Sequence, residues 1–358
     1  MSTKVHNFSA GPGILPDDVI QQAAQAVVNF NGIGLSLLEM SHRSKEYVAV
    51  MDEARAIVKR LMKLGDDYEV LYMGGGASLQ FAMVPFNLLT KTGYAAYLNT
   101  GVWAKKALKE ARMQGKAIEI ATSEENNYSF IPKDYEVPAE ADYFHCTSNN
   151  TIYGTQMKSF PSSPIPMVCD MSSDIFSRVI DFSQFDLIYA GAQKNMGPAG
   201  ATMVVVKKEI LGKNARVIPS MLDYQVHIDG ESMYNTPPVF PVYCVLLTLQ
   251  WIEKMGGIAA VEKLNNAKAE LLYAEIDRNN LFKGTCAVED RSYMNVTFVL
   301  KNPTFEDEFN KLLKEANISG LKGHRSVGGF RASIYNAMPI ESVQVLVDVM
   351  KQFEKIKG

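Results

Sequence analysis

Cysteine and histidine are scarce in this sequence, and neither residue type is grouped. Among 358 residues there are four cysteines and five histidines, and no C-x-x-C pair occurs. This scatter excludes a disulfide framework and offers no ligand set for zinc or another metal. Free thiols are typical of a reducing compartment, so the sequence predicts a cytoplasmic protein without a metal. The cysteines are Cys146, Cys169, Cys244 and Cys286.

Long apolar runs and a strong excess of one charge are also missing. No run approaches the roughly 18 residues that span a bilayer, and the polar start of the chain lacks the apolar segment of a secretory signal. The net charge is only −3, which gives no reason to expect a nucleic acid partner. We therefore expect neither a membrane nor a nucleic acid as partner. The composition, 47% hydrophobic and 21% charged, is that of a globular protein with room for a large and a smaller domain.

One stretch, DLIYAGAQKNMGPAGAT at residues 186–202, carries the strongest chemical signal. Its apolar start predicts a buried strand, and Lys194 follows that strand between two glycine-containing breaks. A solvated loop lysine is the ordinary interpretation of such a position. A rigidly held lysine would instead suit covalent chemistry with an aldehyde cofactor. The rest of the chain decides between these two interpretations.

Predicted strands alternate with helices over residues 17–206, which favours a mostly parallel sheet covered by helices on both faces. In such sheets, ligands collect at the carboxyl ends of the strands. A glycine loop before a helix expected to begin at Leu79 suits a phosphate, although a plain tight turn is equally compatible and no nucleotide-binding pattern is present. Asp170 could cap a helix or face a cofactor. The segments that follow predicted strands are residues 74–78, Trp103, residues 147–151, Asp170, and Gln193 with Lys194.

After about residue 257 the pattern changes to helices and short alternating strands, which predicts a separate α+β domain. Thr304 with Asp307 indicates a capping box at the start of one of its helices. A basic glycine loop at residues 322–331 is either solvated or a clamp for carboxylate or phosphate. Before this domain, residues 223–241 predict a long irregular loop. Near the N-terminus, the cationic pair at residues 42–43 precedes a helix, where positive charge is unfavourable unless an anion binds nearby.

Taken together, these motifs resemble one family over essentially the whole chain. The motifs FSAGPG, SHRS, GGGASLQF, YAGAQKNMGPAG, NTPP, LKGHRSVGGFRAS and IYNAMP look like those of the phosphoserine aminotransferases. These are pyridoxal 5'-phosphate (PLP) enzymes of the class-V, fold-type I group. The resemblance implies an α/β fold with a large PLP-binding domain at residues 15–256 and a small domain of residues 1–14 and 257–358. It also implies a homodimer with shared active sites.

The resemblance implies that one PLP per subunit forms a Schiff base with Lys194, which also moves the proton of the substrate Cα. Asp170 would hold the proton on the pyridine nitrogen, and Trp103 would stack on the ring. Thr151 would lie near the ring hydroxyl. The residues implied to hold the cofactor phosphate are Gly76, Ala77, Ser78 and Gln193, with Asn235 and Thr236 of the neighbouring subunit.

The substrates implied by the resemblance are small anions. Arg331 would bind their α-carboxylate through a bidentate pair, and His324 and Arg325 would bind the distal phosphate. His42 and Arg43 of the partner subunit would join them. The implied reaction transfers an amino group from L-glutamate to 3-phosphohydroxypyruvate, giving O-phospho-L-serine and 2-oxoglutarate in serine biosynthesis. Some members also act on a phosphorylated intermediate of pyridoxine biosynthesis, and the motifs do not decide this point.

Three alternatives deserve comparison. A cysteine desulfurase-like lyase needs a nucleophilic cysteine near the substrate, and none lies in residues 322–331. A serine–glyoxylate aminotransferase would have little use for His42, Arg43, His324 and Arg325 together. A non-enzymatic PLP carrier would not explain Asp170 or Arg331.

Overall fold

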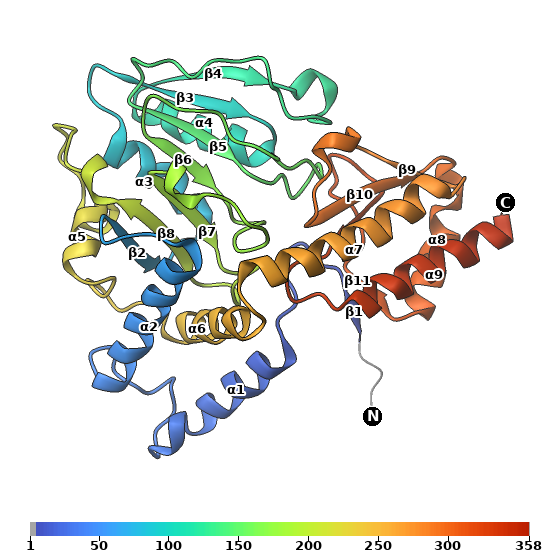
Figure 1. Ribbon diagram of the computed structural model, residues 1–358, viewed down its shortest axis with the longest axis horizontal. Helices are drawn as coiled ribbons and strands as arrows, with labels where there is room; N and C mark the ends of the chain where they lie inside the picture. Colours follow the sequence, from blue (N-terminus) through green and yellow to red (C-terminus); the bar gives the residue numbers. More distant parts are fainter. Residues whose placement is uncertain (1–4, 358) are drawn as a thin grey trace.

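The computed structural model describes residues 5–357, and Figure 1 shows a large sheet with its helices beside a smaller group of strands and helices. The large sheet has seven strands in the order β2-β8-β7-β6-β5-β3-β4. Its strands are β2 (Tyr68–Met73), β3 (Tyr94–Asn99), β4 (Lys116–Thr122), β5 (Tyr143–Thr147), β6 (Met167–Asp170), β7 (Leu187–Gly191) and β8 (Thr202–Lys207). The helices around it are α1 (Asp17–Val28), α2 (Lys45–Met62), α3 (Gly76–Leu88), α4 (Val102–Gln114), α5 (Tyr224–Asp229) and α6 (Val239–Lys254).

The predicted mostly parallel sheet is confirmed. Strands β4, β3, β5, β6 and β7 pair in parallel, and β8 is antiparallel to both β7 and β2. Since β8 alone runs the opposite way, β2 points in the same direction as β7. The carboxyl ends of β2, β7, β6, β5 and β3 therefore lie at one edge of the sheet.

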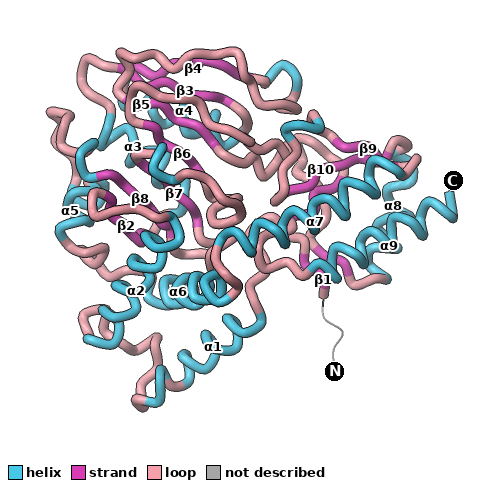
Figure 2. Tube along the Cα trace, in the orientation of Figure 1, coloured by secondary structure: helices cyan, strands magenta, loops and turns pink. Residues whose placement is uncertain are grey.

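The large sheet is buried on both faces, as Figure 2 illustrates with helices on either side of the strands. Successive side chains of a strand point to opposite faces. Accordingly, Val70 and Tyr72 pack in a core with α1, α2 and α6, whereas Leu71 and Met73 pack in a second core with α3 and α4. Strands β5, β6 and β7 are buried at every position. This burial explains why their sequences are continuous apolar runs rather than alternating ones.

The smaller unit, coloured orange to red in Figure 1, matches the predicted α+β domain. It contains α7 (Ile258–Arg278), α8 (Glu306–Glu315) and α9 (Ile340–Lys357) around a three-stranded antiparallel sheet. That sheet has the order β12-β10-β9, with β9 (Phe282–Gly284), β10 (Asn295–Leu300) and β12 (Phe330–Ser333).

The beginning of the chain joins this smaller unit rather than the large sheet. Strand β1 (His6–Asn7) pairs in parallel with β11 (Ile318–Ser319), and Phe8 packs in the core of the smaller unit. This arrangement is compatible with a small domain of residues 1–14 and 257–358. The domain boundaries themselves stay a prediction.

Three local predictions are wrong. Helix α3 begins at Gly76, not Leu79, so the glycine loop forms its first turn. The stretch 223–241 is not wholly irregular, because it contains α5 and the start of α6. Thr304 does not cap α8: its N–H donates to Oδ1 of Asn302 in a short 3₁₀ turn, Pro303–Phe305, that precedes the helix. Proline suits the first position of such a turn because its φ angle is already set.

No single helix within residues 5–357 is both long and apolar enough to cross a membrane. Helices α6 and α7 meet the length and composition criteria only as a joined pair, and they are bent by 87° at the break between them.

Candidate active site

Lys194 lies in the turn that follows β7, at the carboxyl edge of the large sheet. Its Nζ donates a hydrogen bond to Oγ1 of Thr151 at 2.8 Å and lies 6.0 Å from the centre of the Trp103 ring. Burial lowers the pKa of the Lys194 ammonium to about 8, although the Asp170 carboxylate opposes part of this shift. A lysine with this pKa is neutral far more often at pH 7 than an ordinary lysine, and the neutral amine is the nucleophile.

Asp170 is the last residue of β6, the strand beside β7, and only 6% of it is exposed. Burial raises the pKa of its carboxyl group, and the Lys194 charge opposes that shift. Oδ1 also accepts a hydrogen bond from the Ser172 N–H at 2.9 Å. Asp170 therefore fixes a local turn and acts electrostatically on Lys194. It does not cap a helix, because residues 171–180 contain turns and bends but no helix.

Trp103 lies in the first turn of α4, which follows β3 at the same edge. Among the described residues, its indole Nε1 is buried without a hydrogen-bond partner. Buried indole N–H groups normally find a partner, so an unmet donor here indicates a position that a bound molecule completes.

The glycine loop after β2 places free backbone N–H groups at the start of α3. Gly75 precedes the helix with a φ of 90°, and a Cβ there would lie 2.5 Å from Cδ2 of Leu79. At Gly74 and Gly76, by contrast, an added Cβ would meet no atom within 4 Å. Ala77 and Ser78 complete this first turn. Open space in front of unpaired N–H groups at a helix N-terminus fits a phosphate.

These features together fit PLP, the cofactor implied by the resemblance. An amine with a lowered pKa, a buried carboxylate, an indole with an unmet donor and a phosphate cradle all lie at one edge of the sheet. Gln193, the remaining predicted phosphate ligand, directly precedes Lys194, and its carbonyl accepts a hydrogen bond from the Gly13 N–H at 2.7 Å.

Arg331 of the smaller unit lies at the same edge of the large sheet. It lies on β12, and its Nη1 donates to the backbone carbonyl of Thr151 at 3.3 Å, so Thr151 contacts both Arg331 and Lys194. Nε of Arg331 is buried without a partner among the described residues. His324 and Arg325 lie in the loop just before β12. Burial and then the charges of Arg331 and Arg325 lower the pKa of His324, so both guanidinium groups act on the His324 ring.

The remaining four predicted residues lie elsewhere in the chain. His42 and Arg43 line a groove of about 510 Å³ with residues 229–231 and 233–234. Asn235 and Thr236 directly follow this segment and are exposed. No hydrogen bond or ion pair of the described residues joins any of the four to Lys194 or Arg331. Within one chain, these four residues form a second group near the groove. It is separate from the group formed by Lys194 and Arg331.

Two residues at the site were given no role by the sequence analysis, although Thr147 lies in the segment 147–151 named there. Thr147 ends β5 directly opposite Asp170, and among the described residues its buried Oγ1 has no partner. Its place at a strand end is a usable sequence signal. Asn195 follows Lys194, and its Oδ1 accepts a hydrogen bond from the Asn336 N–H at 3.0 Å. No sequence pattern indicates this contact between distant segments.

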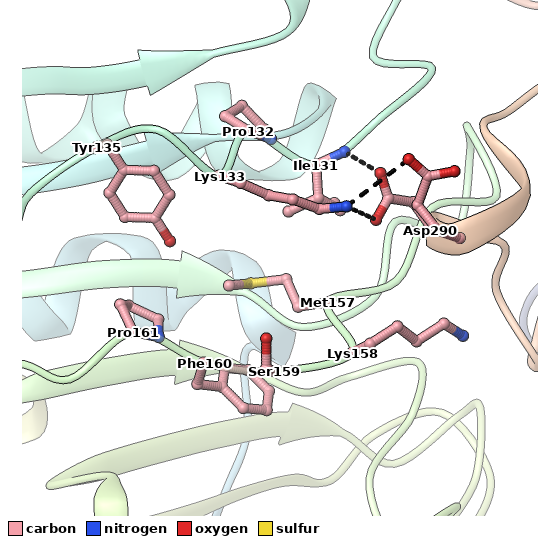
Figure 3. Close-up of a pocket in the computed structure, with 11 residues that line it drawn as sticks. Ile131, Pro132, Lys133, Tyr135, Met157, Lys158, Ser159, Phe160, Pro161 and Asp290 are labelled. Carbon is pink, nitrogen blue, oxygen red and sulfur yellow. Dashed lines mark hydrogen bonds and ion pairs between the residues drawn. The ribbon is translucent and has the colours of Figure 1, made fainter.

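Another cavity, shown in Figure 3, does not belong to this site. It has a volume of about 330 Å³ and lies between residues 131–135, 157–161 and 289–290. Within it, Lys133 reaches Asp290 with an Nζ to Oδ1 distance of 3.6 Å. None of the residues predicted for the site lines this cavity.

Cys286 has none of the properties of a desulfurase nucleophile. Burial raises the pKa of its thiol to about 11, and the thiol donates to the carbonyl of Gly154 at 3.3 Å. A catalytic cysteine needs the opposite shift, because the thiolate is the reactive form.

Comparisons with known proteins agree with this geometry. Residues 5–346 match the family model described as aminotransferase class-V. The chain is 68% identical to a phosphoserine aminotransferase of Flavobacterium johnsoniae, over 98% of this chain and 99% of that protein.

Two solved structures extend the comparison. The phosphoserine aminotransferase of Bacillus circulans subsp. alkalophilus has a TM-score of 0.96 and 45% identity, and the match covers 99% of both chains. The PLP-bound phosphoserine aminotransferase of Trichomonas vaginalis has a TM-score of 0.93 and 36% identity, over 97% of this chain and 100% of that one. The chain therefore belongs to the class-V aminotransferases and, within them, to the phosphoserine aminotransferase family.

Proposed function

We propose that the protein is a phosphoserine transaminase of serine biosynthesis. It would transfer an amino group from L-glutamate to 3-phosphohydroxypyruvate, giving O-phospho-L-serine and 2-oxoglutarate. The observation that carries this proposal is the meeting of Lys194 and Arg331 at Thr151. The lysine supplies the reactive amine, and the arginine binds the α-carboxylate that all of these substrates share.

PLP is the cofactor, and when bound it supplies an aldehyde that takes up the amino group and a ring that accepts the electron pair of the substrate Cα. Lys194 anchors it, and the free amine of Lys194 then moves the proton at Cα. A pKa of about 8 suits that task because a general base works best near the operating pH. Asp170 would hold the proton on the ring nitrogen, and Trp103 would stack on the ring.

The cofactor phosphate is held by donors from two subunits in this proposal. The first turn of α3 and Gln193 supply donors from one subunit, and Asn235 and Thr236 supply donors from the neighbouring one. Thr151, which accepts hydrogen bonds from both Lys194 and Arg331, would lie close to the ring hydroxyl. The α3 residues are Gly76, Ala77 and Ser78.

The distal phosphate of phosphoserine is bound by His324 and Arg325 together with His42 and Arg43 of the partner subunit. The isolated chain supports this division, because the groove at His42 and Arg43 and the exposed Asn235–Thr236 pair are neighbours. His42–Arg43 and Asn235–Thr236 thus belong to one surface. In a dimer, this surface of one subunit can face the Lys194 edge of the other.

An exposed apolar surface supports the homodimer. The segment from α1 to residue 38 exposes large apolar side chains, and Figure 1 shows α1 at the periphery of the molecule. Apolar clusters of this kind normally mark an interface. The side chains and their exposed fractions are Ile20 50%, Val28 75%, Ile33 49%, Leu35 39% and Leu38 62%.

Replacing Arg43 with alanine should raise the KM for O-phospho-L-serine about tenfold or more, because a charge-assisted contact to the phosphate is lost. The KM for L-alanine, which has no distal anion, should change less than twofold. Steady-state kinetics measures both. Lys45→Ala, an exposed cation two residues away, is the matched control and should leave both constants unchanged. Equal losses for the two amino acids would remove Arg43 from the phosphate clamp.

Mixed dimers test the sharing of sites. A dimer of one Lys194→Ala chain and one Arg43→Ala chain contains one site with both substitutions and one native site. Denaturing and refolding an equal mixture should therefore give about a quarter of the wild-type activity at phosphoserine well below its KM, where Arg43→Ala dimers contribute little, since half of the dimers are mixed and each has one native site. If Lys194 and Arg43 of the same chain formed each site, mixing would restore nothing.

The function itself is tested with the absorption spectrum of the PLP-loaded protein. Adding O-phospho-L-serine without a keto acid should bleach the yellow band, and adding 2-oxoglutarate should restore it. If the band does not change with phosphoserine but bleaches with another amino acid, the substrate assignment is wrong. The same assay with the phosphorylated amino acid of pyridoxine biosynthesis tests that additional role.

We further propose that the enzyme works in the cytoplasm. All four cysteines are free thiols, and free thiols persist in a reducing compartment.

A further inference from the structure

Lys268 is a buried cation that the proposed reaction does not use. It lies on α7 and is 1% exposed. Its Nζ donates to the backbone carbonyls of Tyr335 at 2.7 Å and Ile334 at 3.0 Å, with Asn336 at 3.5 Å. These three carbonyls belong to the segment that directly follows β12, the strand that carries Arg331.

Burying the charged amine of Lys268 costs folding free energy. No ion pair of the described residues includes it, and burial lowers the pKa of its ammonium to about 7. An apolar side chain of similar length would fill the space without that cost. The amine holds the carbonyls of residues 334–336 in place through hydrogen bonds. An apolar side chain cannot make these bonds.

The same segment is bonded to the residue after Lys194. The N–H of Asn336 donates to Oδ1 of Asn195 at 3.0 Å, and Nδ2 of Asn195 donates to the Ser173 carbonyl at 3.0 Å. Helix α7 supports Asn336 a second time, because Nδ2 of Asn265 donates to Oδ1 of Asn336 and to the Ser177 carbonyl, both at 2.9 Å. Every one of these residues is at least nine-tenths buried.

A continuous path of hydrogen bonds therefore runs from Lys268 through Asn336 to Asn195, which is adjacent to Lys194. The covalent chain connects the same segment to Arg331, three residues before Ile334. The two groups that would act on the substrate, an amine on the large unit and a guanidinium on the small unit, are joined at this point. A shift of about 1 Å between such groups costs roughly a hundredfold in rate.

We propose that Lys268 is a positioning residue that sets the distance between the Lys194 turn and the Arg331 strand across the boundary of the two units. It touches neither cofactor nor substrate. This inference rests on the proposed transamination and adds to it the residue that aligns its two halves.

The test compares Lys268→Met with Lys158→Met in the PLP-loaded full-length protein. Methionine keeps the length of lysine without its donors. Lys158 is a suitable control because its amine also donates to a carbonyl across the boundary, that of Arg291, and because it lines the cavity in Figure 3, which none of the predicted site residues lines. We expect Lys268→Met to raise the KM for O-phospho-L-serine and L-glutamate together and to lower kcat/KM about tenfold, whereas Lys158→Met stays within twofold.

A second readout uses the protein without cofactor. Hydrogen exchange followed by mass spectrometry should show faster exchange in Lys268→Met at residues 334–338 and also at residues 192–197. In Lys158→Met neither peptide should change. Exchange that accelerates only at 334–338, with unchanged kcat/KM, would overturn the proposal and leave a purely structural lysine.

Lys268→Gln keeps the test decisive if the methionine variant fails to fold. Its amide brings two donors on a shorter side chain, so its kcat/KM should fall several-fold below the wild type. Wild-type values in Lys268→Gln would overturn the inference. Failure of the proposed function is distinguishable, because it appears in the wild-type protein as a spectrum that ignores phosphoserine.

Discussion

Lys194→Ala should lower kcat for phosphoserine transamination by about 10³-fold or more, because it removes the proposed anchoring amine and the proposed base for the Cα proton. The phosphate cradle at α3 and the Trp103 surface remain, so the variant should still bind PLP reversibly. Single-turnover kinetics and the absorption spectrum after dialysis measure these two effects separately.

Two controls separate the chemistry of Lys194 from its charge. Lys194→Arg keeps a cation in the turn, but a guanidinium is a poor nucleophile and base at neutral pH, so it should be as inactive as alanine. Lys208→Ala removes an exposed lysine whose Nζ lies 3.5 Å from a Glu69 carboxylate oxygen, and should keep wild-type kcat. Substantial turnover in Lys194→Arg would show that charge, rather than the amine, is what the reaction needs.

Asp170→Asn should lower kcat about a hundredfold or more while the protein stays folded. The amide can still accept the Ser172 N–H, so the turn survives, but a neutral group no longer holds a proton on the ring nitrogen. Without this carboxylate, the pKa of Lys194 in the cofactor-free protein should fall below its present value of about 8, because Asp170 raises it. Acetylation of Lys194 at varied pH, read by mass spectrometry, measures that shift.

Asp174→Asn is the matched control for Asp170→Asn. Asp174 is a second buried aspartate in the same loop, but its Oδ2 accepts from Gln156 at 3.2 Å and pairs with Arg178 at 3.3 Å. We expect this variant to lose stability and to keep kcat within a few-fold. If both variants lost kcat equally, buried negative charge in this loop would be the requirement, rather than a carboxylate at Asp170.

The large sheet and its ligand edge could be predicted because buried strands are continuous apolar runs that stop at glycine or at a polar residue. Lys194, Asp170 and Trp103 each follow such a stop, and parallel strands bring their carboxyl ends together. The start of α3 was misplaced because Gly75 and Gly76 have low helix propensity. The six-residue α5 was missed because turn-forming residues surround it and a helix that short has little periodicity.

Contacts between distant segments could not be predicted from one sequence. The bond from Asn336 to Asn195 depends on how the two units pack, and the bonds from Lys268 to residues 334–336 depend on how α7 packs within the smaller unit. An asparagine or lysine in an amphipathic helix is indistinguishable, in sequence, from a solvated one. The assignment of His42 and Arg43 to a partner subunit likewise rests on the resemblance; within one chain they line a groove that Lys194 does not line.

The pairing of β1 with β11 has a consequence for the order of events during synthesis. Residues 6–8 are synthesised before the large sheet, but the strand with which they pair is synthesised hundreds of codons later. Likewise, the carbonyl of Ala10 accepts a hydrogen bond from the hydroxyl of Tyr335, which lies 325 positions later in the chain. Until then, the segment near Gly13 has its contact with the Lys194 turn but lacks its contacts with the smaller unit. While the ribosome is still translating, a nascent chain can complete its seven-stranded sheet but cannot close its catalytic centre. A fragment released before Arg331 is made would lack part of the proposed site, and we expect it to be inactive.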